Sequence, residues 1–281
     1  MLPLDEMKLN LLVAYPYFTK EVAAAIKRRE SEIRLFVDSG AFTAWKAGKP
    51  IALDDYCRFI ESLRIIPWRY FALDIVGDPH GSMRNYELML KRGFKPVPVF
   101  TRGEDPSVFD DYYKTTDLVG IGGLVQTPKA INFVKGVMQK TRGRNVHLLG
   151  FGNADAIAWA KPYSFDSSSW SSGVRFGAIH LYDRNGVWLK KFTYEDLPRL
   201  SENHKRVLAI HGCEPSQLAD REQWKNAGDN KRWLQIIPAR AWVRYMIDIR
   251  LKLKSHFFLA VTSEHQANHM INAWDYWRPK K

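Results

Sequence analysis

Short apolar runs alternate with longer amphipathic segments over the first 166 residues of the chain. The apolar runs are nearly continuous, which is typical of parallel strands buried on both faces. The segments between them carry apolar residues at helical spacing. The pattern predicts strands at 9–14, 35–38, 70–74, 96–100, 118–124, 146–151 and 163–166. It predicts helices between them at 20–29, 53–64, 83–92, 129–140 and 154–161.

The pattern changes after residue 166. The serine-rich stretch 167–173 is typical of a loop. Segments 175–182 and 187–192 flank an Asp-Arg-Asn-Gly sequence, which predicts a β-hairpin. From residue 194 onward the pattern is mostly helical, with a strong helix at 239–254. Within a basic C-terminal extension, 255–281, segments 257–261 and 265–277 are candidates for one more strand and helix.

Repeated strand–helix units at this spacing predict an α/β fold. The length of the chain and the number of units favour a (β/α)8 TIM-like barrel that forms a single domain over residues 1–281. Residues 174–236 would form a hairpin and helical insertion late in the chain. An open, doubly wound sheet is the alternative arrangement of the same units.

Composition adds charge and compartment to this picture. The 281 residues are 46% hydrophobic, and no apolar run approaches the roughly 20 residues of a membrane helix. No secretory signal is expected at the N-terminus, and two distant cysteines, Cys57 and Cys213, fit a reducing cytoplasm. The formal net charge of +12 favours a polyanionic partner such as DNA or RNA over the alternative of a basic protein without one.

Aspartates stand at the ends of three predicted strands: Asp38, Asp74 and Asp166. Reacting groups of α/β barrels sit at the carboxyl ends of the strands, so we expect these side chains to face one pocket. Each aspartate taken alone is equally well explained as the N-cap of the next helix. His147, inside an apolar strand, is interpreted as a packed core residue.

Two further strands end in glycines. Gly122 and Gly123 close the strand at 118–124, and Gly150 and Gly152 close the strand at 146–151. Glycine lets a flat ligand approach the backbone closely. Glycine pairs are common in turns, so the joint placement of glycines and aspartates carries the prediction of a site.

These residues, in this order, resemble motifs of the queuine/archaeosine tRNA-guanine transglycosylase superfamily. The resemblance spans roughly residues 34–170 and is looser from 237 to 254, where residues 242–250 resemble the last barrel helix of the family. The family motif Asp-Ser-Gly-Gly-Phe corresponds to Asp38-Ser39-Gly40-Ala41-Phe42, and Phe-Asp-Glu corresponds to Leu73-Asp74. The motif Gly-Gly-Leu corresponds to Gly122-Gly123-Leu124, and Met-Gly-Val-Gly to Leu149-Gly150-Phe151-Gly152. The nucleophile motif Phe-Asp corresponds to Phe165-Asp166.

The resemblance implies a pentosyltransferase that exchanges a purine base at C1′ of a nucleoside through a covalent glycosyl–enzyme intermediate. It implies that Asp166 is the nucleophile and that Asp38 transfers the proton. It requires no cofactor, and a free 7-deazaguanine base is the co-substrate. It assigns base binding to Asp74, Ser39, Gly122, Gly123, Leu124, Gly150 and Phe151.

The sequence also departs from the family. Its tRNA enzymes carry a Cys-x-Cys-x-x-Cys plus His zinc site after the nucleophile, whereas only Cys213 follows Asp166 here, so we expect no metal site of that kind. A short chain without this zinc site resembles the compact phage-type branch, which inserts preQ0-type bases into DNA. DNA is therefore favoured over tRNA, in the host cytoplasm if the protein is phage-encoded.

Basic residues outside the predicted strands are candidate phosphate contacts, although each is equally well explained as part of a solvated surface. They are Arg102, Arg142, Arg144, Arg175, Lys190 and Lys191, with Arg278, Lys280 and Lys281 in the C-terminal tail.

Four alternatives to a DNA-modifying transglycosylase fit the same residues. They are a tRNA-guanine transglycosylase without zinc, a DNA N-glycosidase, a non-catalytic nucleic-acid-binding subunit and an unrelated barrel enzyme for a small phosphorylated substrate. The intact aspartate trio argues against the non-catalytic subunit. The missing glycine-rich phosphate loop argues against the last.

Overall fold

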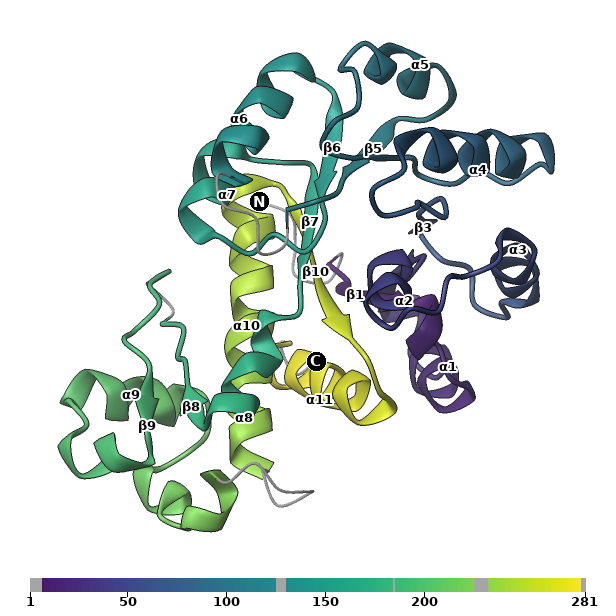
Figure 1. The fold of residues 1–281 in the computed structure, drawn as a ribbon. Coiled ribbons are helices and arrows are strands. Elements are labelled where there is room, and N and C mark those ends of the chain that lie inside the picture. Colours follow the sequence, from purple (N-terminus) through teal and green to yellow (C-terminus); the bar gives the residue numbers. More distant parts are fainter. Residues whose placement is uncertain (1–6, 125–129, 184, 225–231, 279–281) are drawn as a thin grey trace.

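The computed structural model describes residues 7–124, 130–183, 185–224 and 232–278. Its centre is a curled sheet of eight parallel strands with helices around it (Figure 1). The strands lie in the order β3-β2-β1-β10-β7-β6-β5-β4. This confirms the α/β class and the parallel sheet expected from the sequence. The bounds are β1 (Leu9–Ala14), β2 (Ile33–Asp38), β3 (Arg69–Tyr70), β4 (Val99–Phe100), β5 (Leu118–Ile121), β6 (Asn145–Leu148), β7 (Ser164–Ser167) and β10 (His256–Val261).

The edges of this sheet, β3 and β4, approach each other just beyond their paired residues. An isolated parallel bridge joins Phe71 to Val97. The amide of Val97 donates to the carbonyl of Tyr70 at 2.8 Å, and the amide of Ala72 donates to the carbonyl of Val97 at 2.8 Å. Neighbouring strands are therefore consecutive in the chain, apart from the insertion before β10. A doubly wound sheet, whose strand order reverses at a switch point, does not have this order.

Helices connect the strands close to the predicted positions, except that α10 begins at Arg232, inside the predicted insertion and before the predicted helix start at residue 239. They are α1 (Lys20–Lys27), α3 (Leu53–Ser62), α4 (Pro79–Lys91), α6 (Ala130–Lys140), α7 (Ala154–Ala160), α10 (Arg232–Leu253) and α11 (Glu264–Trp277). Two helices before β7 were not predicted, α2 (Ala41–Lys46) and α5 (Val108–Thr115), because each is too short for a clear helical period. Single 3-10 turns occur at η2 (Tyr15–Tyr17), η3 (Glu30–Glu32) and η4 (Ser169–Ser171).

Side chains alternate across the sheet and fill two layers of core. Leu9, Leu11 and Val13 of β1 pack outward with the helices, whereas Leu12 points to the inner face of the curled sheet. Large apolar side chains fill this inner face, which explains why the strands are apolar on both sides. The inner cluster consists of Leu12, Phe36, Phe71, Val97, Val99, Leu118 and Phe258.

The insertion after β7 has a hydrophobic cluster of its own. It contains α8 (Ser172–Phe176), β8 (Ala178–Ile179), β9 (Phe192–Thr193), η5 (Tyr194–Arg199), α9 (Glu202–Ile210), η6 (Pro215–Leu218) and η7 (Arg221–Trp224). The hairpin is present, because β8 and β9 pair antiparallel and Tyr182 bridges Trp188. Its predicted start at residue 175 is wrong, because that residue lies in α8. The loop predicted at 167–173 is likewise wrong in part, because it includes η4 and the start of α8.

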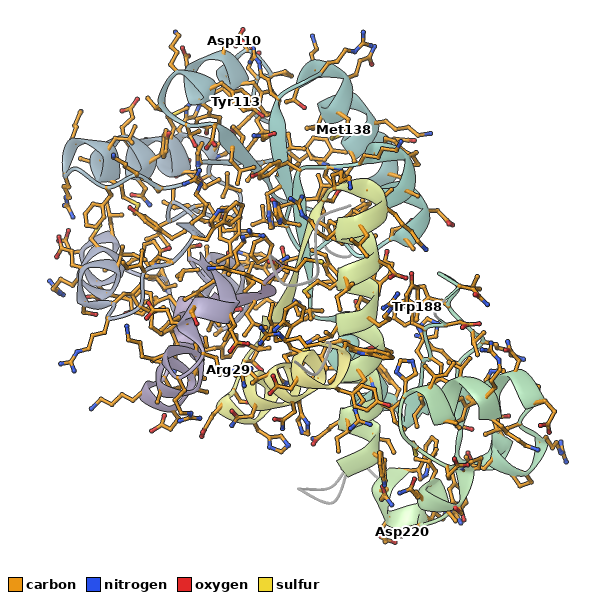
Figure 2. All side chains as sticks on the ribbon, turned by 180° about the vertical axis from the view of Figure 1, so that it is seen from behind. Arg29, Asp110, Tyr113, Met138, Trp188 and Asp220 are labelled. Atoms are coloured by element: carbon orange, nitrogen blue, oxygen red, sulfur yellow. The ribbon has the colours of Figure 1, made fainter. Side chains whose placement is uncertain are left out.

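Trp188 anchors the hairpin to the rest of the molecule. Its ring lies 4.9 Å from that of Trp242 and 5.3 Å from that of Tyr245, both on α10. Figure 2 shows Trp188 beside this long helix. The hydroxyl of Tyr182 adds a buried hydrogen bond of 3.1 Å to Asp248 on the same helix. The hairpin is therefore fixed to α10 by packed rings and one polar contact.

The segment that we described as a basic C-terminal extension is part of the sheet architecture. β10 inserts between β1 and β7, and α11 packs on α10 and α1. Its strand is apolar and buried because it has neighbours on both sides. None of the helices in the described part of the chain combines the length and apolar character that a bilayer crossing requires.

Candidate active site

Three aspartates gather at the carboxyl ends of the strands, as the sequence predicted. Asp38 is the last residue of β2, Asp74 follows β3 and Asp166 lies in β7. Parallel strands end on the same side of their sheet, so these side chains share one end. The carboxylates interact: the charges of Asp74 and Asp166 both act on the titration of Asp38. Residues distant in the chain therefore form one acidic cluster.

The surroundings of Asp38 raise its pKa toward neutral pH. Its Oδ2 accepts a hydrogen bond of 3.0 Å from the amide of Gly40. Burial, followed by repulsion from Asp74 and Asp166, raises the pKa of Asp38 from 3.8 to about 7. A carboxyl group with this pKa can donate a proton and take one back in a single reaction cycle.

Asp74 is oriented by the residue that follows Asp38. The buried hydroxyl of Ser39 donates to Oδ1 of Asp74 at 2.9 Å. Burial raises the pKa of Asp74, and this hydrogen bond opposes the rise. Ser39 thus orients the carboxylate of Asp74, and the hydroxyl proton of Ser39 is used in that hydrogen bond.

Asp166 is fixed through one oxygen. Its Oδ1 accepts hydrogen bonds from the amide of Gly150 at 2.8 Å and pairs with Nε2 of His147 at 3.1 Å. Nδ1 of His147 lies 2.9 Å from the hydroxyl of Ser164. A carboxylate oxygen only accepts, so this network fits a proton on Nε2 of His147 and a hydrogen bond that the hydroxyl of Ser164 donates to Nδ1. No described residue donates to the other oxygen, Oδ2, of Asp166.

His147 is a site residue that the sequence interpretation missed. It is fully buried, which agrees with the packed position that we predicted, but it also pairs with Asp166. Its ring lies 4.9 Å from that of Phe36 and 5.1 Å from that of Phe71, so the imidazole has little freedom to turn. The available signal was its register: Val146 and Leu148 face the helices, so His147 must point inward.

A fourth carboxylate, Glu104, was also missed. It follows β4 at the same end of the sheet and accepts a 2.9 Å hydrogen bond from the hydroxyl of Thr101. Burial raises the pKa of Glu104, and the charge of Asp74 adds to the rise. The acidic cluster therefore extends from β2 and β7 to the loop after β4.

Glycines close the strands where the site lies. Gly150 has φ +61, and its amide donates to Asp166. Gly150 therefore orients this carboxylate and does not line an open slot for a base. Gly123 has φ +68, and a Cβ on Gly122 would lie 3.1 Å from Val99. The remaining predicted base contacts, Leu124 and Phe151, are buried at 4% and 6% exposure and belong to the main core.

The candidate phosphate contacts do not share one face. Arg102 follows β4 at the carboxyl end and lies 5.1 Å from the Phe133 ring. Lys190 and Lys191 are on the hairpin of the insertion. The side chain of Arg175, together with Lys280 and Lys281, lies outside the described residues. Arg278 pairs with Glu32.

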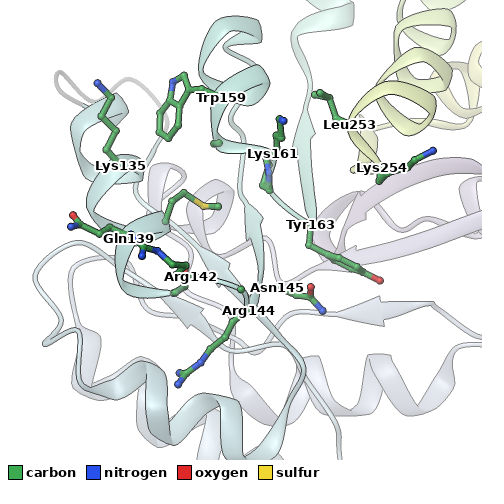
Figure 3. A pocket seen from close by; sticks show the side chains of 15 residues that line it. Lys135, Gln139, Arg142, Arg144, Asn145, Trp159, Lys161, Tyr163, Leu253 and Lys254 are labelled. Carbon is green, nitrogen blue, oxygen red and sulfur yellow. The ribbon is translucent and has the colours of Figure 1, made fainter.

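Arg142 and Arg144 lie at the opposite end of the sheet, in the loop before β6. They line a cavity of about 620 Å³ together with Tyr163 and Lys254 (Figure 3). This cavity opens at the amino ends of the strands and is remote from the acidic cluster. We assign the candidate active site to the carboxylates, because their convergence, and not the size of a cavity, supplies reactive groups.

Comparisons with protein-family models, with curated proteins and with solved structures found no match to this chain. The functional argument therefore depends on the site residues themselves.

Proposed function

We propose that this protein is a base-exchange transglycosylase that replaces guanine in DNA by a preQ0-type 7-deazaguanine. We further propose that the sheet is a closed (β/α)8 barrel whose insertion takes the place of the zinc subdomain of the tRNA enzymes. The observation that carries the proposal is the acidic cluster, in which one carboxyl group titrates near pH 7 and another is held by two hydrogen bonds. Two carboxylates with different environments are what a double displacement at an anomeric carbon requires.

Asp166 is the proposed nucleophile. Hydrogen bonds from His147 and Gly150 hold Oδ1, whereas none of the residues that the structure describes donates to Oδ2, the proposed attacking atom. Oδ2 bonds to C1′ of the target nucleotide while the bond from C1′ to N9 of guanine breaks. The intermediate is a glycosyl ester of Asp166.

Asp38 is the proposed acid and base. With a pKa of about 7 it is partly protonated at neutral pH, and it gives its proton to the departing guanine. The incoming 7-deazaguanine then gives its N9 proton to Asp38 and bonds to C1′ through N9. The ester to Asp166 breaks, so each residue returns to its starting state.

Base recognition falls to Asp74 and the glycine turn after β5. Asp74, held by Ser39, would accept hydrogen bonds from the amino and ring N–H groups of the base. By the family resemblance, the backbone at Gly122 and Gly123 would bind the O6 or 7-substituent edge. Leu124 and Phe151 would support the slot from the core.

Nucleic acid is the proposed partner because the chain carries a formal net charge of +12. The target base must leave the helical stack to reach Asp166, which is buried, and the partly buried Asp38 and Asp74, at a cost of about a few kcal/mol. Arg102, at the same end as the acidic cluster, is the best-placed phosphate contact. Arg142 and Arg144, at the opposite end of the sheet, are too far away to touch the same nucleotide.

The direct test is nucleoside mass analysis after incubation of the protein with preQ0 and either duplex DNA or tRNA. We expect the 7-deazaguanine nucleoside in DNA. Incorporation only into tRNA would support the zinc-free tRNA enzyme, and abasic sites formed without added base would support the N-glycosidase. No change in either nucleic acid would refute the proposal.

A variant pair tests the role of Asp166. Asp166→Ala should abolish both base exchange and the denaturant-stable adduct with DNA. Asp117→Ala, which removes an exposed carboxylate before β5, serves as the matched control and should keep both. Exchange of labelled guanine by Asp166→Ala would show that another group attacks C1′.

A further inference from the structure

Two histidines and a glutamine that are not members of the acidic cluster converge between the last two long helices. His265 and His269 are four residues apart on α11, so their side chains lie on one face of that helix. Gln235 reaches them from α10, which packs beside α11 (Figure 1). Nε2 of His265 lies 2.7 Å from Oε1 of Gln235, and Nε2 of His269 lies 2.9 Å from it. The two Nε2 atoms are 3.0 Å apart.

Hydrogen bonds alone do not satisfy this triangle. An amide oxygen only accepts, and an imidazole nitrogen either donates or accepts. If both histidines donate to Gln235, their two N–H groups oppose each other at 3.0 Å. If one donates, the lone pair of the other faces the amide oxygen. Exchanging the oxygen and nitrogen of the amide lets its two N–H groups donate to both histidines, but the two imidazole lone pairs then face each other at 3.0 Å. Every assignment leaves one contact between two like groups.

A cation at the centre of the triangle removes the conflict, because it accepts all three lone pairs at once. We propose that His265, His269 and Gln235 form a binding site for a divalent transition-metal ion. Zinc bonds to imidazole nitrogen and to oxygen are about 2.0–2.2 Å long, which places tetrahedral ligand atoms about 3.3 Å apart. The three atoms need to separate by only a few tenths of an ångström.

The ligand set selects the class of ion. Imidazole suits zinc, copper and nickel, whereas magnesium and calcium take oxygen ligands. No third His, Cys, Asp or Glu joins the pair within the described ranges. Water completes the coordination, because His265 is exposed at the surface. The site therefore differs from the thiolate zinc site of the tRNA enzymes in ligand type, and it uses residues of two helices.

A bound ion would link α10 to α11 where both begin, near the end of β10. The ion would stabilise the folded chain by an amount that grows with the logarithm of the ratio of its concentration to the dissociation constant. The effect on stability is independent of base exchange, so the metal site and the proposed function can fail separately.

The experiment measures zinc binding to the full-length protein at pH 7.5 by equilibrium dialysis, after treatment with a chelator. We expect one tightly held Zn²⁺ per chain. The double variant His265→Ala/His269→Ala should bind zinc at least tenfold more weakly, and Gln235→Leu should weaken binding less. His80→Ala, which removes an exposed histidine on α4, is the matched control and should bind as wild type.

Two further readouts separate the site from non-specific binding. Co²⁺ should give the visible absorption of a tetrahedral nitrogen and oxygen site in wild type and lose it in the double variant. Zinc should raise the melting temperature of wild type and leave that of the double variant unchanged, with circular dichroism verifying that both are folded. Absence of binding to wild type, or equal binding by the double variant, would overturn the proposal.

Discussion

Replacing Asp38 by asparagine tests whether the three aspartates share one desolvated site. Burial, then Asp74 and Asp166, raise the pKa of Asp38 from 3.8 to about 7. The folded protein therefore holds this proton to a higher pH than the unfolded chain does. The stability contributed by the proton is complete below about pH 4 and is lost as the pH rises through 7. Asparagine keeps the shape of the neutral acid and does not titrate.

The magnitude follows from the two pKa values. Between pH 5 and pH 8 the titration of Asp38 costs the wild-type protein roughly 2–3 kcal/mol of unfolding free energy, and Asp38→Asn does not lose it. Groups that do not interact with Asp38 titrate alike in both proteins and cancel in the difference. The variant should therefore gain this amount over wild type when the pH changes from 5 to 8.

Urea denaturation at pH 5 and pH 8 measures the difference. The control is Asp111→Asn, which removes an exposed carboxylate on α5. Its difference from wild type should be the same at both pH values. If Asp38→Asn behaves like this control, Asp38 ionises as a surface acid does, and the proposed convergence of carboxylates is refuted.

Two further variants test contacts of the site and the insertion. His147→Phe fills the position of the ring but donates no hydrogen bond to Asp166. We expect the free energy of unfolding, measured in urea, to fall by about 2 kcal/mol. We also expect kcat to fall at least tenfold at a similar KM. His147→Gln should recover part of kcat, and a higher KM at unchanged kcat would contradict the role. Trp188→Ala should lower the free energy of unfolding by about 2 kcal/mol and make the hairpin susceptible to proteolysis. Trp188→Phe should cause neither effect. Equal digestion of the two variants would contradict the anchoring role.

The periodicity of the sequence was sufficient to predict the strands and most helices. Strand β1 has the predicted bounds, because a buried parallel strand needs a run of apolar residues that few other segments offer. Helices α2 and α5 were not found, since six to eight residues carry too little periodicity. The start of the hairpin was misplaced because apolar content does not distinguish the short α8 from a strand.

The positions of the candidate catalytic groups were predictable for a different reason. Parallel strands must end together, so Asp38, Asp74 and Asp166 had to lie on one side once the strands were known. The strand register indicated that His147 points inward, but its contact with Asp166 was not predictable. A lone histidine in an apolar strand has the same pattern whether it only packs or also holds a carboxylate.

The sequence by itself determined the parallel α/β class, the end of the sheet that carries the acidic groups, and the fact that only one cysteine follows Asp166. These depend on local periodicity and on residue identity, which the chain displays directly. Only the tertiary structure decided which partners meet. The hydrogen bond of Gly150 to Asp166, the burial that alters Asp38 and the contact of Gln235 with His265 all join segments whose separation in space no local pattern encodes.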